Sequence, residues 1–522
     1  MRILIVCYLL VAISLVGHAQ AKQRKLGPAL NYASFNYWAP FVCLDGNTLL
    51  FTSDYTEDNM PSAFIALRQG VDWKEPVMIP KKISALTYSK AFTLSPDGKT
   101  LFIPSSRGGT LGGFDIFVSQ VSGTTFSEPV SMGTPINSPA NEAGPTFSPD
   151  GNIMYFMRCN KMNANGADEC KIMIAKKKYG NWDAPTELPS VINAGNSQMP
   201  RMLGDGQTLL FSSNKHQPGK GGMDLYISRY IDNQWSAPVN LEFVNTPQDD
   251  LYASASSAGL NLLKDAPGER KSELVEFLIP PDVKPKAVIK VMGVVEGLTD
   301  LTKANVNLVN VATKQTLFNL NPDAKGNFVC YITEGNVYGL FVDPPTDNFR
   351  YFVKRYDLTA GKKIPNIDRV SATLKPLGPG DEIELAGVSF KPFSSEIEAT
   401  SIVELQKVSR LIKGNAALSF NVDVTLFGLM KDSIQLQDLT EVITDTVVYE
   451  KEFQIDSVTT ETRDSIALEY IYHNDRTPKQ AQAIADFLIK QGVKPERILI
   501  TYKALEETLA EKRKTVVYLK AR

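Results

Sequence analysis

Residues 93–106 read TLSPDGKTLFIPSS, and copies of this phrase recur along the first half of the chain. The clearest copy is TFSPDGNIMYFMRC at 146–159, and weaker copies are FVCLDGNTLLFTSD at 41–54 and RMLGDGQTLLFSSN at 201–214. A fifth and worn copy, ASSAGLNLLKD, occupies residues 255–265. Recurrence at a fixed period indicates a repeat architecture in which each unit is one supersecondary element.

The repeat places an Asp-Gly pair before an apolar run. The pairs begin at Asp45, Asp97, Asp150 and Asp205, in steps of 52, 53 and 55 residues, and Gly259 lies one further step along. Asp-Gly between alternating apolar residues predicts a hairpin turn with positive φ at its central residues. A second strand follows, as in GGFDIFVSQ, and a third follows Trp or Phe and then Pro. Four-stranded units that bury their faces only against neighbours predict an all-β propeller of five blades.

These residues resemble PD40 repeats, the SPDG version of the WD40-like propeller blade found in bacterial envelope proteins. The resemblance covers about residues 30–280 and is closest in the second, third and fourth copies. Three tryptophans, Trp73, Trp182 and Trp235, share one position in the repeat. A position that recurs in every unit favours packing between blades over contact with a ligand.

The first residues predict export. Arg2 precedes the apolar run 3–16, and Ala19-Gln20-Ala21 precedes Lys22, so residues 1–21 resemble a cleavable signal peptide. The apolar run is shorter than the about 20 residues that a membrane anchor needs. In an exported protein the closely spaced Cys159 and Cys170 predict a disulfide, the alternative being two free thiols.

The sequence predicts no catalytic, cofactor or metal site. It contains neither a G-x-S-x-G elbow nor a phosphate-binding loop, and its three histidines are scattered at positions 18, 216 and 473. The segment NANGADE at 163–169 differs from a calcium loop, because Lys161 and Ile172 stand where carboxylates are needed. A net charge of -2 gives no support to nucleic-acid binding.

The middle of the chain has the pattern of a small β-sandwich. Pro-rich IPPDVKPKA at 279–287 predicts a linker. Residues 286–376 then alternate apolar and polar positions between turns at 323–326 and 334–336. The order Gly-x-Val, ANVNLVN, GNF and GNVYGL resembles the carboxypeptidase regulatory-like domain, which implies a non-catalytic spacer or adhesive module.

From about residue 385 the pattern becomes α/β. LAGVSF at 385–390 predicts a strand, and the following helix has apolar residues on one face up to Ile412. A second helix is predicted at 477–491, with Thr477 as its cap and Pro478 at its first helical position. Strands follow each helix. This order resembles the OmpA-like C-terminal domain over residues 385–522, apart from an insert at about 430–472.

The OmpA-like family holds peptidoglycan through an Asp and an Arg, and neither is present in this chain. Gln480 takes the place of the arginine, Thr477 that of a serine in the same motif, and Leu429 falls near the place of the aspartate. A neutral Gln offers no charged fork for a carboxylate. We therefore expect the second helix to fold normally but not to hold peptidoglycan in the usual way.

The acidic insert predicts either an added β-hairpin or a loop exposed to a partner. The three domains in this order resemble envelope proteins of Bacteroidota, including a periplasmic component of the type IX secretion system whose N-terminal helical repeats are absent here. The resemblance implies a non-enzymatic periplasmic scaffold or adaptor, peripherally associated with the outer membrane or cell wall. Its propeller would bind a protein partner, and its tail would face peptidoglycan or another envelope protein. The alternatives are a propeller that senses a glycan or peptide and, less favoured, a propeller hydrolase.

Overall fold

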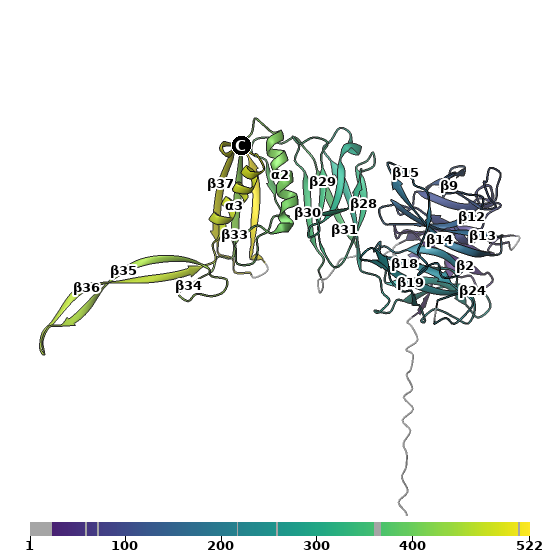
Figure 1. Ribbon diagram of the computed structural model, residues 1–522, viewed down its shortest axis with the longest axis horizontal. Helices are drawn as coiled ribbons and strands as arrows, with labels where there is room; N and C mark the ends of the chain where they lie inside the picture. The colour runs from purple at the N-terminus through teal and green to yellow at the C-terminus, as the bar shows by residue number, and fades with distance from the viewer. Residues whose placement is uncertain are drawn as a thin grey trace, which may run out of the picture. The chain divides into compact units, whose positions relative to one another are not determined.

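The computed structural model describes residues 23–57, 60–69, 72–216, 218–256, 259–359, 367–509 and 512–522. The predicted signal peptide, residues 1–21, lies outside the described residues. The chain divides into two compact units, residues 1–288 and 289–522, and each is described by itself (Figure 1). No helix among the described residues is long and apolar enough to cross a membrane.

The first unit contains five antiparallel sheets that follow one another along the chain. The first sheet consists of β2 (Tyr37–Val42), β3 (Thr48–Ser53), β4 (Ser62–Gln69), β5 (Asp72–Trp73) and β6 (Val77–Met78). The second consists of β7 (Thr93–Leu94), β8 (Thr100–Ser105), β9 (Asp115–Ser122), β10 (Thr125–Phe126) and β11 (Val130–Ser131). The third consists of β12 (Asn141–Phe147), β13 (Ile153–Met162), β14 (Ala167–Lys178), β15 (Asn181–Trp182) and β16 (Thr186–Glu187). The fourth consists of β17 (Ser197–Met202), β18 (Thr208–Ser213), β19 (Asp224–Ile231), β20 (Gln234–Trp235) and β21 (Val239–Asn240). The fifth consists of β1 (Gln23–Lys25), β22 (Ala253–Ala255), β23 (Asn261–Pro267) and β24 (Ser272–Leu278).

The outermost strand of the first four sheets is split into two short pieces. In the first sheet, β5 and β6 both pair with β4, and Pro76 lies between them. A proline has no N–H to donate to a ladder and is confined to sheet edges and interruptions. The single third strand predicted after each Trp or Phe is therefore two strands, with the aromatic residue ending the first of them.

Apolar clusters lie between neighbouring sheets of the first unit. Each of four clusters joins two sheets that are consecutive in the chain, as where Phe41 of β2 packs with Leu101 of β8. A further cluster joins the fifth sheet to the first, through Leu263 and Leu274 on one side and Leu49 on the other. Sheets that bury their faces only against neighbouring sheets are the architecture of a β-propeller.

The Asp-Gly turns have one geometry in all five copies. Five glycines, one for each copy, have φ between 66° and 73°, and the N–H of each donates to the carbonyl three residues earlier: Gly46, Gly98, Gly151, Gly206 and Gly259. The four aspartates that precede Gly46, Gly98, Gly151 and Gly206 do not have positive φ, so the expectation of positive φ at both central positions is wrong for them. In the first copy, Asp45 instead accepts hydrogen bonds from the N–H groups of Asn47 and Thr48. These bonds hold an Asx turn, which keeps the aspartate at negative φ.

The second unit begins with two sheets that enclose one apolar core. The three-stranded sheet consists of β28 (Asn327–Thr333), β25 (Val288–Glu296) and β31 (Ile367–Thr373). The four-stranded sheet consists of β27 (Gln315–Leu320), β26 (Asn305–Asn310), β29 (Val337–Asp343) and β30 (Phe352–Asp357). Gly293 of β25 is a close approach point, because a Cβ there would lie 1.9 Å from the Phe328 ring.

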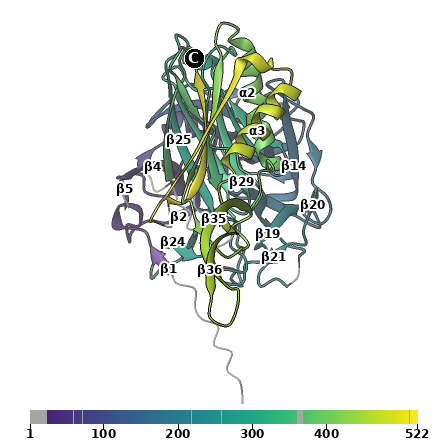
Figure 2. The same cartoon turned by 90° about the vertical axis from the view of Figure 1, so that its left-hand side faces the viewer.

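The C-terminal part of the second unit is a four-stranded sheet with two helices. The sheet order is β32 (Glu382–Glu384), β38 (Lys514–Ala521), β33 (Phe420–Phe427) and β37 (Ile498–Leu505). Figure 2 shows α2 (Ile402–Gly414) beside α3 (Thr477–Lys490), and both pack their apolar residues into one core with β33 and β38.

The predicted strand at 385–390 is wrong, because the sheet strand is β32 and the chain turns away after it. Val388 donates to the carbonyl of Leu385, and the N–H of Gly387 donates to the Glu404 carboxylate on α2 at 2.5 Å. This backbone hydrogen bond to a buried carboxylate replaces the ladder bond that a longer strand would make.

The insert is a long β-hairpin, so of the two predicted alternatives the structure has the hairpin. Strands β35 (Glu441–Gln454) and β36 (Thr460–His473) pair over 14 residues each, and β34 (Lys431–Asp432) pairs with the base of β36 (Figure 1). Most of its side chains are exposed. Asp456 accepts hydrogen bonds from Val458 and Thr459 and so shapes the turn at its tip.

Short helical turns complete the structure. They are α1 (Lys81–Ser84), η1 (Pro28–Leu30), η2 (Ser89–Ala91), η3 (Leu301–Lys303), η4 (Ala399–Ser401) and η5 (Pro495–Arg497).

Candidate functional site

A hollow of about 410 Å³ lies beside the fifth sheet of the first unit. Two segments line most of it, residues 246–252 and residues 264–272. The second segment contains the end of β23, the turn after it and the start of β24. Its lining includes charged residues of both signs: Asp249, Asp250, Lys264, Asp265, Arg270 and Lys271. The hollow therefore brings six ionisable side chains together on these segments.

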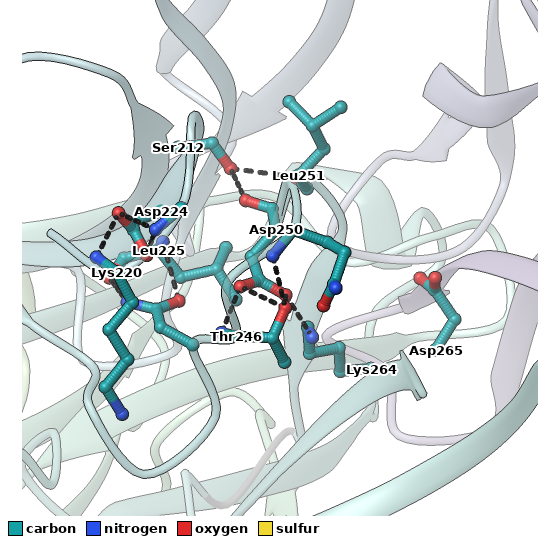
Figure 3. A network of polar contacts seen from close by, with 12 residues as sticks. Ser212, Lys220, Asp224, Leu225, Thr246, Asp250, Leu251, Lys264 and Asp265 are labelled. Atoms are coloured by element: carbon teal, nitrogen blue, oxygen red, sulfur yellow. Dashed lines mark hydrogen bonds and ion pairs between the residues drawn. The ribbon is translucent and has the colours of Figure 1, made fainter. Parts of the chain in front are cut away.

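The centre of this region is a buried ion pair between Asp250 and Lys264 (Figure 3). The side chains are only 3% and 7% exposed. Asp250 also accepts from the backbone N–H of Thr246 at 2.5 Å and from its hydroxyl at 3.1 Å. Because both buried charges have partners, the pair costs less than either ion would alone.

Neighbouring polar residues hold the loop that carries Asp250. The Ser212 hydroxyl donates to the carbonyls of Asp250 and Leu251, at 3.0 and 2.9 Å. Figure 3 shows Asp224 close by, where it accepts from the N–H of Lys220 at 2.9 Å. Ser212 of β18 thus holds the loop before β22 in position. The ion pair is therefore preorganised by the surrounding hydrogen bonds.

Asp265, next to Lys264, is half-buried and lies apart from the ion pair in Figure 3. Burial raises the pKa of its carboxyl, and Lys264 opposes that rise. Its carboxyl accepts a 3.4 Å hydrogen bond from the N–H of Ala39. The carboxyl of Asp265 is therefore easier to protonate than an exposed aspartate.

Within the described ranges, no group of three or more His, Cys, Asp or Glu side chains is arranged to hold a metal ion. The loop 163–169, weighed as a calcium site, is a tight turn in which Asn163 accepts from the N–H groups of Asn165 and Gly166. The hollow offers charged side chains of both signs to a polar ligand.

The C-terminal residues compared with the peptidoglycan pocket lie at the start of α3 and at the end of β33. Gln480 is 6% exposed, and its amide donates to the Ser394 carbonyl at 3.2 Å. Leu429 is half-buried, and its N–H donates to the carbonyl of Leu505 at 2.9 Å. Gln480 is therefore held by the loop before α2, and Leu429 by the end of β37.

Thr477 is not the cap of α3, so that prediction is wrong. It is the first helical residue, and its N–H and hydroxyl both donate to the Asp475 carboxylate, at 3.0 and 2.7 Å. A carboxylate accepts more strongly than a threonine hydroxyl at this positive end of a helix. The helix consequently begins one residue earlier than predicted, with Pro478 at its second position.

Sequence reasoning missed Arg476, which fastens the insert to α3. Its guanidinium donates to the Thr440 hydroxyl at 2.9 Å and also to the Asp438 carbonyl. Lys479 adds an ion pair with Glu441 at 2.6 Å. The sequence could have indicated this contact, since Arg476 and Lys479 both lie at the start of the second helix, shortly after the insert.

Cys159 and Cys170 form a disulfide, as predicted, and directly oppose each other in β13 and β14. Both are fully buried. The other two cysteines of the described chain, Cys43 and Cys330, are free and buried. The bridge therefore reinforces two paired strands of the third sheet.

The three repeated tryptophans pack between sheets, as their shared position suggested. Trp73, Trp182 and Trp235 are half-buried, and each packs against an intersheet cluster. Trp73 also carries the Arg68 guanidinium 4.8 Å above its ring, and Trp182 carries the Lys177 ammonium at 5.0 Å. Other residues of the protein therefore cover the tryptophan rings.

No family model and no curated protein matches the chain. Among solved structures, one similar chain is a TolB-like protein from Agrobacterium tumefaciens, at 18% identity and a TM-score of 0.29, over 57% of this chain and 90% of that one. An oligogalacturonate lyase in complex with manganese matches at 11% identity and a TM-score of 0.29, over 50% and 94%. An α-L-arabinofuranosidase from Podospora anserina matches at 10% identity and a TM-score of 0.32, over 50% and 98%. Likeness at this level carries no argument about function, and the propeller fold rests on the sheets described above.

Proposed function

We propose that this protein is a non-enzymatic scaffold or adaptor of the cell envelope, exported to the periplasm. In this proposal residues 30–280 form a closed five-bladed propeller that binds a protein partner. The cluster that joins the fifth sheet to the first supports closure. The pairing of β1 with β24 supports it too, because the first strand of the unit completes its last sheet.

The observation that carries the proposal is the exposed apolar surface of the β35–β36 hairpin. Side chains opposite each other share a face, and on one face Val448 opposes Ile466 and Thr446 opposes Leu468. The exposed fractions are 59% for Val448, 70% for Ile466 and 55% for Leu468. Apolar side chains gathered at this exposure mark interaction surfaces in soluble proteins. The hairpin would be the arm through which the tail of the protein meets an envelope partner.

The charge pattern of the same face narrows the kind of partner. Beyond Val448 and Ile466, toward the tip, the next opposed pair is Glu450 with Asp464, followed by Glu452. Like charges directly opposite each other destabilise a ribbon. A partner that presents an apolar patch next to cationic residues would relieve this repulsion while burying the patch.

Photocrosslinking in the native envelope tests the proposal. A photoreactive residue at Ile466 is expected to capture one envelope protein, while the same residue at Leu317, which is 41% exposed in the sandwich, is expected to capture none. Equal capture from the two positions, or capture from neither, would contradict a specific partner on the hairpin.

The α/β tail is proposed to face the cell wall or another envelope protein without the usual grip on peptidoglycan. With Gln480 donating only to Ser394 and Leu429 apolar, a peptide-stem carboxylate and amine would both lack a charged partner. The isolated 380–522 segment is therefore expected to stay in the supernatant when sacculi are sedimented. The double variant Leu429→Asp with Gln480→Arg is the matched comparison, and pelleting of the unmodified segment that free diaminopimelate reverses would refute this part.

A further inference from the structure

The innermost strands of three sheets have a register shift at corresponding positions. The register of β2 with β3, of β12 with β13 and of β17 with β18 shifts by one residue near the middle of each inner strand. At these shifts three residues have positive φ: Ala39 at 50°, Gly144 at 58° and Met199 at 48°. A bulge bends its strand and redirects the next side chains, and positive φ at a residue other than glycine is costly. In β17 the shift falls between Gln198 and Arg201, so the strained backbone at Met199 lies two residues before Arg201.

Arg201 is buried without a matching anion. It is 5% exposed, and its guanidinium lies 5.2 Å from the centre of the Phe41 ring. One Nη donates to the Pro200 carbonyl at 2.9 Å, whereas the buried Nε has no hydrogen-bond partner. Across the part of the chain that the structure describes, no carboxylate forms an ion pair with this guanidinium.

Arg201 lines a cavity of about 40 Å³. The innermost strands of all five sheets contribute to its walls, through Phe41, Leu94, Thr146, Arg201 and Ser254. One water needs roughly 10–15 Å³ of such space. The cavity therefore has room for a small ion or for two or three waters.

Burial of an unpaired guanidinium costs several kcal/mol even after relaxation. Deprotonation does not remove the cost, because burial lowers the pKa of Arg201 only to about 10, which leaves it charged at neutral pH. A charge-assisted hydrogen bond to an anion is about twice as strong as a bond to a neutral acceptor such as water. An anion beside Nε would satisfy both the charge and the orphaned donor.

We propose that Arg201 and the cavity beside it form a binding site for a small monovalent anion, a halide or a carboxylate of formate size. The site is independent of the proposed role as a scaffold, since it lies among the inner strands of the first unit. The anion would contribute to holding the five inner strands together.

Thermal unfolding of the full chain in different sodium salts at one ionic strength tests the site. We expect chloride and formate each to raise the Tm relative to gluconate, which is too large for the cavity. A tenfold excess of anion over its dissociation constant corresponds to a rise of about 3–5 °C in a unit of this size. A response to chloride but not formate would assign a halide site, and the converse would assign a carboxylate site.

Two variants separate binding from general stability. Arg201→Gln is expected to lose the difference between chloride and gluconate. Arg158→Gln removes an arginine whose charge Glu142 already meets at 2.8 Å, and it is expected to keep that difference. Crystals of the unmodified protein grown in bromide should show an anomalous peak in contact with Arg201. Equal Tm in all three salts would overturn the proposal, and so would a cavity without bromide in a protein whose Tm chloride raises.

Discussion

At the scale of single residues, Glu404 is the clearest source of pH dependence. It lies on α2 and is 1% exposed, with Gly387 donating to one carboxyl oxygen and the Tyr351 hydroxyl to the other at 3.2 Å. Burial is the largest influence and raises its pKa to about 8. The folded protein therefore holds a proton at Glu404 that the unfolded chain releases near its ordinary pKa of about 4.3.

Glu404→Gln is expected to flatten the pH dependence of stability. Between about pH 4.5 and pH 8 the folded state binds more protons at Glu404 than the unfolded state, so stability falls as pH rises through this window. The loss approaches about 1.4 kcal/mol per pH unit. Between pH 5.5 and pH 7.5, the free energy of unfolding should fall more for the wild type than for the variant. An unchanged slope in the variant would mean that Glu404 titrates normally.

The Asp250–Lys264 pair supports a second prediction at this scale. Lys264→Met leaves the carboxylate of Asp250 buried and unpaired, so a loss of about 3–5 kcal/mol in the free energy of unfolding is expected. Adding Asp250→Leu removes the stranded charge, and the double variant should recover most of that loss. Urea titration of the three chains gives the coupling directly. Additive losses would show that the two side chains do not stabilise each other.

At the scale of elements, the β35–β36 hairpin buries little and is expected to be dispensable for folding. Replacing residues 445–469 by Asn-Gly joins Thr444 to Tyr470, which oppose each other in the register. The base held by Arg476 and Lys479 is retained. The free energy of unfolding should change by no more than about 0.5 kcal/mol, as measured by thermal melts of the full chain. A loss of several kcal/mol would instead make the hairpin part of the core.

The elements also show which features a sequence can specify. The glycine of each repeated turn was predictable, because glycine adopts positive φ without a steric cost, and it marked even the worn copy at Gly259. The start of α3 was not, since Asp475 and Thr477 can both accept from the first N–H groups of a helix and only the folded geometry decides between them. The Asp250–Lys264 pair was also unpredictable: fourteen residues and a sheet strand separate the partners. The hairpin was one of two alternatives, because its alternating residues are exposed on both faces.

At the scale of the whole molecule, stability of the first unit is shared among its sheets. A chain that ends after residue 205 lacks the cluster between the fourth and fifth sheets and that between the fifth and the first. It is expected not to unfold cooperatively, because each remaining end sheet exposes an apolar face. A chain that ends after residue 288 keeps every cluster and should melt in one transition. Calorimetry distinguishes the two, and a sharp transition in the shorter chain would argue against shared stability.

The pairing of β1 with β24 has a consequence for the time course of synthesis. Arg24 and Glu276, which form an ion pair across these strands, are 252 residues apart in the chain. At about 5–20 residues per second, a ribosome needs roughly 13–50 s to make the residues between them. For that interval β1 is finished but has no strand to join. The last sheet must therefore wait for the end of the unit to be made, and during that wait an extended segment stays available to chaperones and proteases.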